Sequence, residues 1–273
     1  MRQARALCAA LLLCPMAAGA DGHYGAGPMA GMFGTVSPGF KAAETDLQYR
    51  RLFETGADVW SGRSSIEFAL APQIAVQGDF LKGRVNDDVR PDQRGLVDGR
   101  LNDGVPGRFG DFQSLMLHGV YDHSAATTFG AYLGRDYALG DDATTFGIET
   151  ALEFQGSEIQ GWLGRSIIDG DENDVTTIGL SARSEMQLGI GLDASVIHDE
   201  VGGRDASFTN VEFGVSYDVL NYSEIYATAG YAMTDGPLGS DGEATLGVGI
   251  RIGIGGEDGG TTFGGRSYFE SLR

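Results

Sequence analysis

The feature that most constrains the fold is an alternation of apolar and polar residues over residues 144–154. One parity carries Phe146, Ile148, Leu152 and Phe154, interrupted only by Thr150, and the other carries Thr145, Gly147, Glu149, Ala151 and Glu153. Strict alternation of this length predicts a β-strand whose two faces meet different environments. The apolar face could pack inside a soluble sandwich, or it could face lipid while the carboxylates line a lumen. Both environments favour the same pattern, so the rest of the chain must distinguish them.

Similar alternation recurs along the chain and predicts about twelve strands. It is clearest over residues 188–196, 211–219 and 246–254, and weakest in the first strand, where Arg51 shares its parity with Leu47. The predicted strands are residues 45–55, 64–71, 73–83, 111–122, 127–137, 144–154, 157–168, 174–184, 187–198, 207–219, 222–233 and 243–254.

The connections between these strands alternate between short and long. The short ones lie at residues 72, 123–126, 155–156, 185–186 and 220–221, and the longer ones at residues 56–63, 84–110, 138–143, 169–173, 198–206 and 234–242. Membrane barrels have short turns at one end and longer loops at the other, and their tilted strands need about 9–11 residues to cross the bilayer. With an even strand count, these features predict an all-β fold, an up-and-down antiparallel transmembrane β-barrel.

Charged residues within the strands fall mostly on the polar parity. A basic residue facing lipid at the bilayer midplane costs about 2–4 kcal/mol, so the polar parity should face the lumen. Arg135 and Arg165 break the rule, but both lie near strand ends, where a long side chain can reach water. The predicted pore-lining residues are Glu149, Glu153, Arg183, Asp193, Glu212, Glu224 and Arg251.

The N-terminal residues have the features of an export signal. Arg2 and Arg5 precede an apolar run over residues 6–13, and a small-residue site predicts cleavage after Ala20. Without this signal peptide, 17 basic residues face 38 acidic ones, a net charge of about −21. Such a charge argues against a nucleic-acid partner. The predicted organisation is a signal peptide (1–20), a Gly/Pro-rich lead-in or plug segment (21–44), the barrel (45–254) and a Gly-rich tail (255–273).

On this architecture the sequence resembles the Gram-negative outer-membrane β-barrel superfamily, and most of all the porins. The resemblance covers residues 45–254 and rests on the strand pattern rather than on a motif. It implies passive transport of small hydrophilic solutes or ions with no cofactor, and outer-membrane lipid, lipopolysaccharide and the barrel-assembly machinery as partners. It also implies a trimer. Such barrels commonly end on an aromatic residue, whereas here a tail follows Ile254, so residues 261–269 could form additional structure.

A long charged connection over residues 84–110 is the candidate constriction loop. By resemblance to porins, it would fold inward and narrow the pore with basic and acidic side chains; the alternative is a solvated surface loop. Its candidate residues are Arg84, Arg90, Arg94, Arg100, Arg108, Asp87, Asp88 and Asp92. Many glycines on the polar parity indicate strong curvature, or room for a plug formed by residues 21–44 or 255–273. We expect a narrow aqueous lumen.

Two local patterns resemble parts of chemical sites but lack the residues or the spacing that such sites need. The acidic run over residues 169–174 begins like a calcium loop, but Asp174 and Leu180 stand where an EF-hand needs Gly and Glu. Ser114 and His118 share a strand face about 13 Å apart, too far for direct proton transfer.

We therefore predict a passive channel with mild cation preference, not an enzyme. The alternatives are a plugged structural or envelope-interaction barrel, an outer-membrane lipid-modifying enzyme and a secreted soluble β-sandwich.

Overall fold

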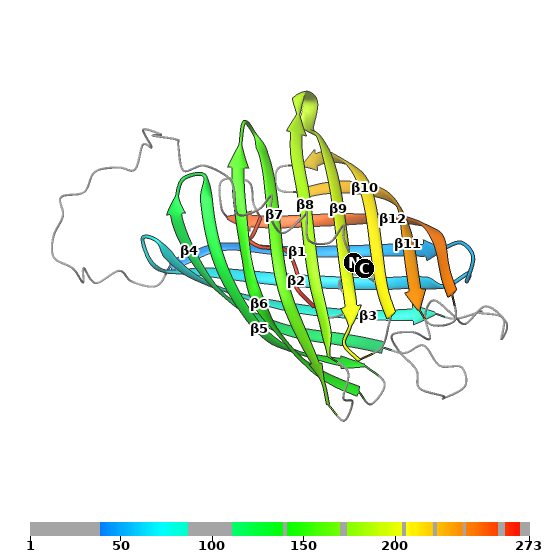
Figure 1. Ribbon diagram of the computed structural model, residues 1–273. Coiled ribbons are helices and arrows are strands. Elements are labelled where there is room, and N and C mark those ends of the chain that lie inside the picture. The colour runs from blue at the N-terminus through cyan, green and yellow to red at the C-terminus, as the bar shows by residue number, and fades with distance from the viewer. Residues whose placement is uncertain are drawn as a thin grey trace, which may run out of the picture. The chain divides into compact units, whose positions relative to one another are not determined.

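Twelve antiparallel strands close into one barrel (Figure 1). The computed structural model describes residues 39–86, 111–138, 141–169, 174–203, 206–220, 223–236, 239–255 and 260–267. The strands are β1 (Gly39–Leu52), β2 (Asp58–Ala71), β3 (Ile74–Asn86), β4 (Asp111–Ser124), β5 (Thr127–Ala138), β6 (Asp141–Phe154), β7 (Ser157–Ile168), β8 (Val175–Met186), β9 (Ile190–Val201), β10 (Ala206–Leu220), β11 (Ser223–Gly236) and β12 (Gly239–Gly255). Each pairs with its sequence neighbours, and β1 pairs with β12 to close the ring. The predicted up-and-down barrel and its strand number are confirmed.

The barrel carries its apolar side chains outside and its polar side chains inside. Leu117 on β4 and Ile148 on β6 point outward and are 57% and 62% exposed, whereas their neighbours His118 and Glu149 are buried. Exposed large apolar residues occur on all twelve strands, far more than a protein in water presents. This inverted pattern is that of an outer-membrane barrel. It decides against the soluble sandwich.

Several strands run further than predicted. β1 begins at Gly39 instead of residue 45, β2 at Asp58 instead of residue 64, and β12 at Gly239 instead of residue 243. Residues 39–44 therefore belong to the barrel rather than to the lead-in. Near strand ends the alternation fails, because apolar residues occur on both faces: Val59 points inward and Trp60 outward. Backbone pairing continues there without a sequence signal.

The connections lie at two ends of the barrel, which we call the short-turn end and the long-loop end. Two-residue turns such as Pro72-Gln73 and Gln155-Gly156 lie at the short-turn end, with the start of β1 and the end of β12. At the long-loop end, β3 and β4 are separated by residues 87–110, but only residues 237–238 separate β11 from β12. Most connections at the long-loop end are therefore shorter than predicted, because the strands extend into residues that were predicted to form loops.

One predicted strand starts too early. Residues Gln187–Gly189 form a 3-10 turn before β9, although the sequence pattern assigned them to the strand. Leu188 and Gly189 have φ angles of 71° and 70°. A tight turn needs such left-handed residues, so the apolar Leu188 is a turn residue that mimics the strand pattern.

The inward glycines make room for aromatic rings on neighbouring strands. A Cβ on Gly179 would lie 1.9 Å from the Trp162 ring, and one on Gly249 would lie 2.3 Å from the Tyr226 ring. A Cβ on Gly164 would lie 2.1 Å from the hydroxyl oxygen of Tyr132. The glycines thus allow large side chains to fill the interior, as small barrels require.

The two arginines on the outward face end in ion pairs at the long-loop end. Arg135 pairs with Asp142 and Asp169, and Arg165 pairs with Asp174. Both strands end three residues further on, so the guanidinium groups lie near the edge of the apolar surface. The described residues contain no helix that is long and apolar enough to cross a membrane.

The outward face of β6 offers a test of lipid contact. Ile148→Arg places a charge in the middle of the strand, and Phe154→Arg places the same charge at its end. We expect the free energy of unfolding to fall by about 2–4 kcal/mol for Ile148→Arg and by about 0–1 kcal/mol for Phe154→Arg, because the cost depends on depth in the bilayer. Urea unfolding of protein refolded in phospholipid vesicles measures both. Equal costs would contradict a lipid-facing β6.

Candidate functional site

The interior of the barrel is the candidate functional site. Its inner face forms two regions, which we call the β2–β7 wall and the β8–β12 wall; β1 closes the ring between β2 and β12. Both walls are dominated by polar and charged side chains, in contrast to the apolar outer surface.

Guanidinium and carboxylate groups form a network on the β8–β12 wall and β1. Arg251 Nη1 lies 2.5 Å from Glu224 Oε1, and its Nη2 lies 3.6 Å from Asp46 Oδ2. Glu224 also pairs with Arg183, and the Tyr226 hydroxyl donates a 2.6 Å hydrogen bond to Asp46. Two further pairs are Arg50–Glu212, between β1 and β10, and Arg63–Glu44, which joins β2 of the other wall to β1. The charges of this wall are thus largely paired across strands.

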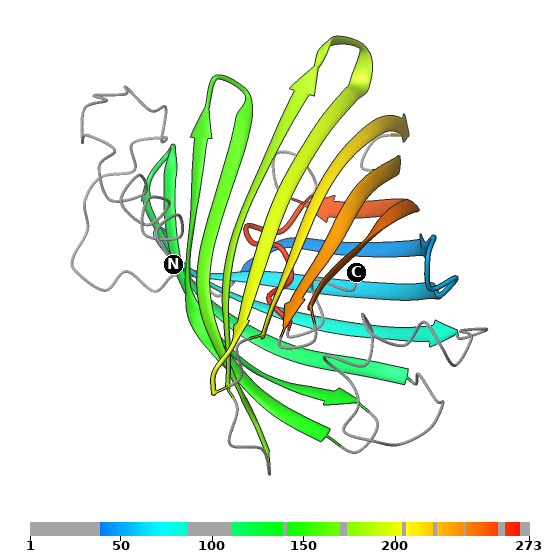
Figure 2. The ribbon, with the colours of Figure 1, turned by 45° about the vertical axis from the view of Figure 1, so that its right-hand side comes forward.

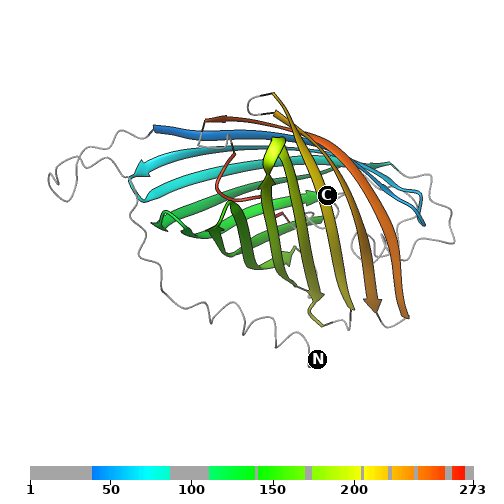
Figure 3. The same ribbon diagram turned by 90° about the horizontal axis from the view of Figure 1, so that it is seen from above.

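Residues 260–267, which we call the luminal segment, lie inside the barrel against the β2–β7 wall. Figures 2 and 3 show this red segment within the ring of strands, beyond the end of β12. It has no regular secondary structure, so its backbone groups need side-chain partners. The sequence left open whether residues 261–269 form additional structure. Within the described part, they add a segment in the lumen and no strand.

Side chains of β2, β3 and β7 bind the backbone of the luminal segment. Thr262 N donates to Glu67 Oε2 at 2.8 Å, and Gln77 binds both N and O of Phe263, at 3.1 and 2.8 Å. Gln160 Nε2 donates to Thr262 O at 3.1 Å. Glu67 and Gln77 are fully buried, so these bonds are shielded from water.

Arg266 ties the luminal segment to the middle of the wall. Its Nε donates to Glu149 Oε2 at 2.8 Å, its Nη2 donates to Gln160 Oε1 at 2.7 Å, and its guanidinium lies 4.2 Å from the centre of the Trp162 ring. The next residue, Ser267, donates to Asp136 Oδ1 at 2.8 Å. A buried guanidinium with charge, hydrogen-bond and ring partners is strongly oriented.

The Phe263 side chain fills a fitted site in the wall. It is 0% exposed and packs with Ala75, Val120 and Ala151. A Cβ on Gly130 would lie 2.5 Å from the Phe263 ring, so only glycine leaves space there. The luminal segment is therefore held by both apolar and polar contacts.

His118 extends the polar contacts behind the segment. Its Nδ1 lies 2.7 Å from Glu149 Oε1, and its Nε2 lies 3.2 Å from Asp79 Oδ2. The ring is fully buried and stacks on Phe263 with centroids 6.4 Å apart. Both ring nitrogens thus face carboxylates, and not Ser114, which lies on the same strand face.

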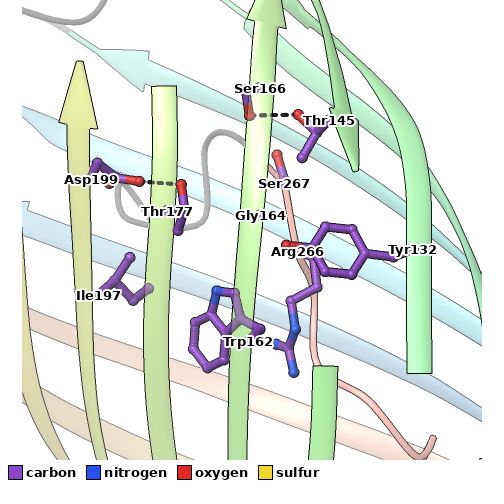
Figure 4. Close-up of a pocket in the computed structure, with 10 residues that line it drawn as sticks. All are labelled: Tyr132, Thr145, Trp162, Gly164, Ser166, Thr177, Ile197, Asp199, Arg266 and Ser267. Atoms are coloured by element: carbon purple, nitrogen blue, oxygen red, sulfur yellow. Dashed lines mark hydrogen bonds between the residues drawn. The ribbon is translucent and has the colours of Figure 1, made fainter. Parts of the chain in front are cut away.

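A cavity of about 10 Å³ lies between the luminal segment and strands β5–β9 (Figure 4). Tyr132, Trp162 and Arg266 lie on one side of it, and Thr177 and Asp199 are hydrogen bonded on another. The space suffices for about one water molecule. This part of the interior is therefore packed rather than open.

Water reaches the interior along the short-turn half of the β8–β12 wall. The inward side chains of Arg183 and Arg251 are 32% and 24% exposed, whereas those of Glu67 and Glu149 on the opposite wall are 0% exposed. Other half-exposed inward residues there are Ser181, Asp193, Ser195 and Tyr226. The accessible part of the lumen is thus a charged surface opposite the luminal segment.

Apolar side chains meet across the lumen toward the long-loop end, and we call this cluster the apolar closure. Val59, Leu81, Val85 and Phe112 from β2–β4 pack in one cluster with Val175 from β8, a strand that pairs with none of these. All are at most 3% exposed. An apolar constriction resists the passage of water and ions.

The predicted pore-lining residues lie on both walls of the barrel. Arg183, Asp193, Glu212, Glu224 and Arg251 lie on the inner face of the β8–β12 wall, where Asp193 and Glu212 are half-buried. Glu149 lies on the other wall, covered by Arg266, and Glu153 lies exposed beside the Gln155-Gly156 turn. Whether these residues line a permeation path stays a prediction.

The predicted constriction loop falls largely outside the described residues, as do the signal peptide and its cleavage site. Arg84 is described: it lies on β3, which extends to Asn86, and pairs with Asp111 at 3.7 Å on the outward face. It is therefore a strand residue and not a loop residue. Arg90, Arg94, Arg100, Arg108, Asp87, Asp88 and Asp92 lie outside the described residues.

The residues that bind the luminal segment are not among the predicted site residues, apart from Glu149. Glu67, Gln77 and Asp136 lie on the inward parity of β2, β3 and β5, so alternation could have placed them in the lumen. No local pattern pointed to Arg266 or Phe263. Among the described residues, no group of three or more His, Cys, Asp or Glu side chains is arranged to hold a metal ion.

The sequence matches no family model and no curated protein. Solved structures of similar fold include the COG4313 outer membrane channel from Pseudomonas putida F1, with a TM-score of 0.56 and 10% identity over 83% of this chain and 99% of that chain. The NanC porin matches with a TM-score of 0.56 and 6% identity over 77% and 100%, and the KdgM porin with 0.53 and 6% over 77% and 99%. This chain has the fold of a porin-like outer-membrane barrel. At these identities the likeness concerns the fold.

The buried Glu149 offers a test of the polar packing. Glu149→Gln leaves Arg266 and His118 without their shared carboxylate, and we expect the free energy of unfolding to fall by about 3–5 kcal/mol. Glu153→Gln, on the same face but exposed, should change it by less than about 0.5 kcal/mol. Urea unfolding in vesicles compares the two. A Glu149→Gln variant as stable as the Glu153→Gln control would contradict the observed packing.

Proposed function

We propose that this protein is a passive channel for small hydrophilic solutes or ions across the outer membrane. The observation that carries the proposal is the water-accessible, charged surface on the β8–β12 wall, inside a barrel whose outer surface is apolar. A channel needs a polar lining and a constriction, not a reactive group. The porin-like fold supports the same function by analogy.

The accessible charges favour a mild preference for cations. Arg183 and Arg251 share Glu224, Arg251 also lies 3.6 Å from Asp46, and the neighbouring Asp193 adds a half-buried carboxylate, so three carboxylates face two guanidinium groups. The acidic composition of the chain, with a formal net charge of −19, favours cations near its mouths.

Single-channel recording in a planar bilayer tests the function directly. Protein refolded in detergent should give reproducible ohmic steps, with reversal potentials in a salt gradient on the cation-selective side. Silent protein with an intact β circular-dichroism spectrum would contradict an open channel, and anion-selective reversal potentials would contradict the preference.

Asp193→Asn should lower the cation-over-anion permeability ratio. A unit charge about 8 Å from a permeating ion in water contributes about 0.5 kcal/mol, which is about twofold for each ion, favourable to cations and unfavourable to anions. Because both effects enter the ratio, the loss of the charge should reduce it about fivefold. The matched control is Asp142→Asn, which removes a carboxylate paired with Arg135 near the long-loop end of the outer surface. An Asp193→Asn channel with wild-type reversal potentials would show that permeating ions do not approach this wall.

The apolar closure should limit conduction. Val175→Ser replaces an apolar side chain in that cluster with a smaller one that carries a hydroxyl, which favours wetting, and we expect a larger single-channel step. Leu192→Ser, on the exposed outward face of β9, is the control. If both variants conduct like the wild type, permeation does not cross the closure.

The luminal segment and the apolar closure favour a second candidate, a plugged structural or envelope-interaction barrel without transport. In that case the protein should stay silent in the bilayer even when folded, and Val175→Ser should also be silent.

We also propose a route by which the protein is exported and assembled. A signal peptide cleaved after Ala20 would direct the chain across the inner membrane of a Gram-negative cell, and the barrel-assembly machinery would insert it among outer-membrane lipid and lipopolysaccharide. The apolar outer surface supports the membrane location. A trimer rests only on the analogy with porins. Mass spectrometry of the mature protein from outer-membrane fractions would test the cleavage site.

A further inference from the structure

We propose that the β2–β7 wall is a binding site for the luminal segment, and that the bound segment sets the width and the ion selectivity of the mid-lumen. The inference rests on the proposed channel function. Porin-like architecture does not require it, because it concerns residues that follow the last strand of the barrel.

The course of the luminal segment shows how it narrows the lumen. Thr262 binds Glu67 and Phe263 binds Gln77, both near the short-turn ends of their strands. Arg266 binds Glu149 at mid-strand, and Ser267 binds Asp136 near the long-loop end of β5. The segment therefore enters from the short-turn end, where β12 ends, and runs along the wall toward the long-loop end.

The contacts are those of a built binding site. Four partner side chains on the wall, Glu67, Gln77, Asp136 and Glu149, are 4% exposed or less, and Gln160 is 9% exposed. Lys41 adds a cation at the entrance, with its Nζ 2.8 Å from Glu67 Oε1 and 3.2 Å from the hydroxyl oxygen of Thr262. A segment resting loosely in a wide lumen would leave these groups to water.

The bound segment also conceals negative charge. Glu67 and Glu149 are covered by Thr262 and Arg266, and Arg266 supplies a cation that offsets Glu149. If the segment leaves, the wall presents these carboxylates and Asp136 to the lumen, while one arginine departs. Release should therefore widen the lumen and make it more cation-selective. A general loosening of the barrel would not by itself predict the increase in cation selectivity.

The test first removes the contact of Arg266 with Glu149 and then reattaches the segment to the wall with a disulfide bond. Arg266→Ala should give a larger single-channel step and move the reversal potential further toward the cation side. The control Arg165→Ala removes an equal charge from the outward face, where Arg165 pairs with Asp174, and should conduct like the wild type. An Arg266→Ala channel with wild-type step size and reversal potential would overturn the proposal.

The restoring variant carries Asp136→Cys and Ser267→Cys together with Arg266→Ala. Both sequence cysteines, Cys8 and Cys14, lie in the predicted signal peptide, so the mature protein should offer no competing thiol. Oxidation should return conductance and selectivity toward those of an oxidised Asp136→Cys, Ser267→Cys protein that keeps Arg266, and reductant should reverse the effect. Identical currents in oxidised and reduced protein, with the disulfide verified by mass spectrometry, would overturn the constriction.

The disulfide separates failure of this inference from failure of the channel function. Its efficient formation in folded protein supports binding of the segment to the wall, whether or not current flows. If every variant is folded and cross-linked but gives no current, both the channel function and the proposed constriction are wrong. If wild-type protein conducts but the disulfide does not form, the channel stands and the binding site is wrong.

Discussion

Contact with lipid governs every other feature of this barrel. Hydrocarbon offers no hydrogen bonds to backbone N–H and C=O groups, so each strand must pair on both sides and the sheet must close. The pairing of β1 with β12 completes that ring. Because alternate residues of a strand point to opposite faces, closure places the polar parity of all twelve strands in one confined interior.

Confinement makes the inward charges depend on partners. An unpaired buried charge is far more costly than a paired one. On the β8–β12 wall, Arg251 meets this need by contacting Glu224 and Asp46 from other strands. On the β2–β7 wall, part of the compensation comes from outside the strands, since Arg266 of the luminal segment pairs with Glu149. The segment is thus part of the interior packing and not an addition to it.

As a consequence, packing and exposure to water differ from one part of the interior to another. The β2–β7 wall is packed by the luminal segment and by rings set over glycines, as with Trp162 over Gly179. Toward the long-loop end, Val175 and Phe112 belong to one apolar cluster. On the described part of the β8–β12 wall, the inward charges of the short-turn half, such as Arg183 and Arg251, meet water. A solute entering from the short-turn end would therefore meet paired charges first.

The sequence by itself determined the barrel class, the number of strands and the inward placement of Glu149, Arg183 and Glu212, because side-chain alternation is a local property of a strand. It misjudged the ends of β1 and β12, where alternation fails but pairing continues. Only the tertiary structure decided which inward residues meet water and which meet the luminal segment. Phe263 and Gln77 are 186 positions apart, and Arg266 and Glu149 are 117 apart. No local pattern records such contacts; they exist only because the closed barrel brings distant strands around one interior.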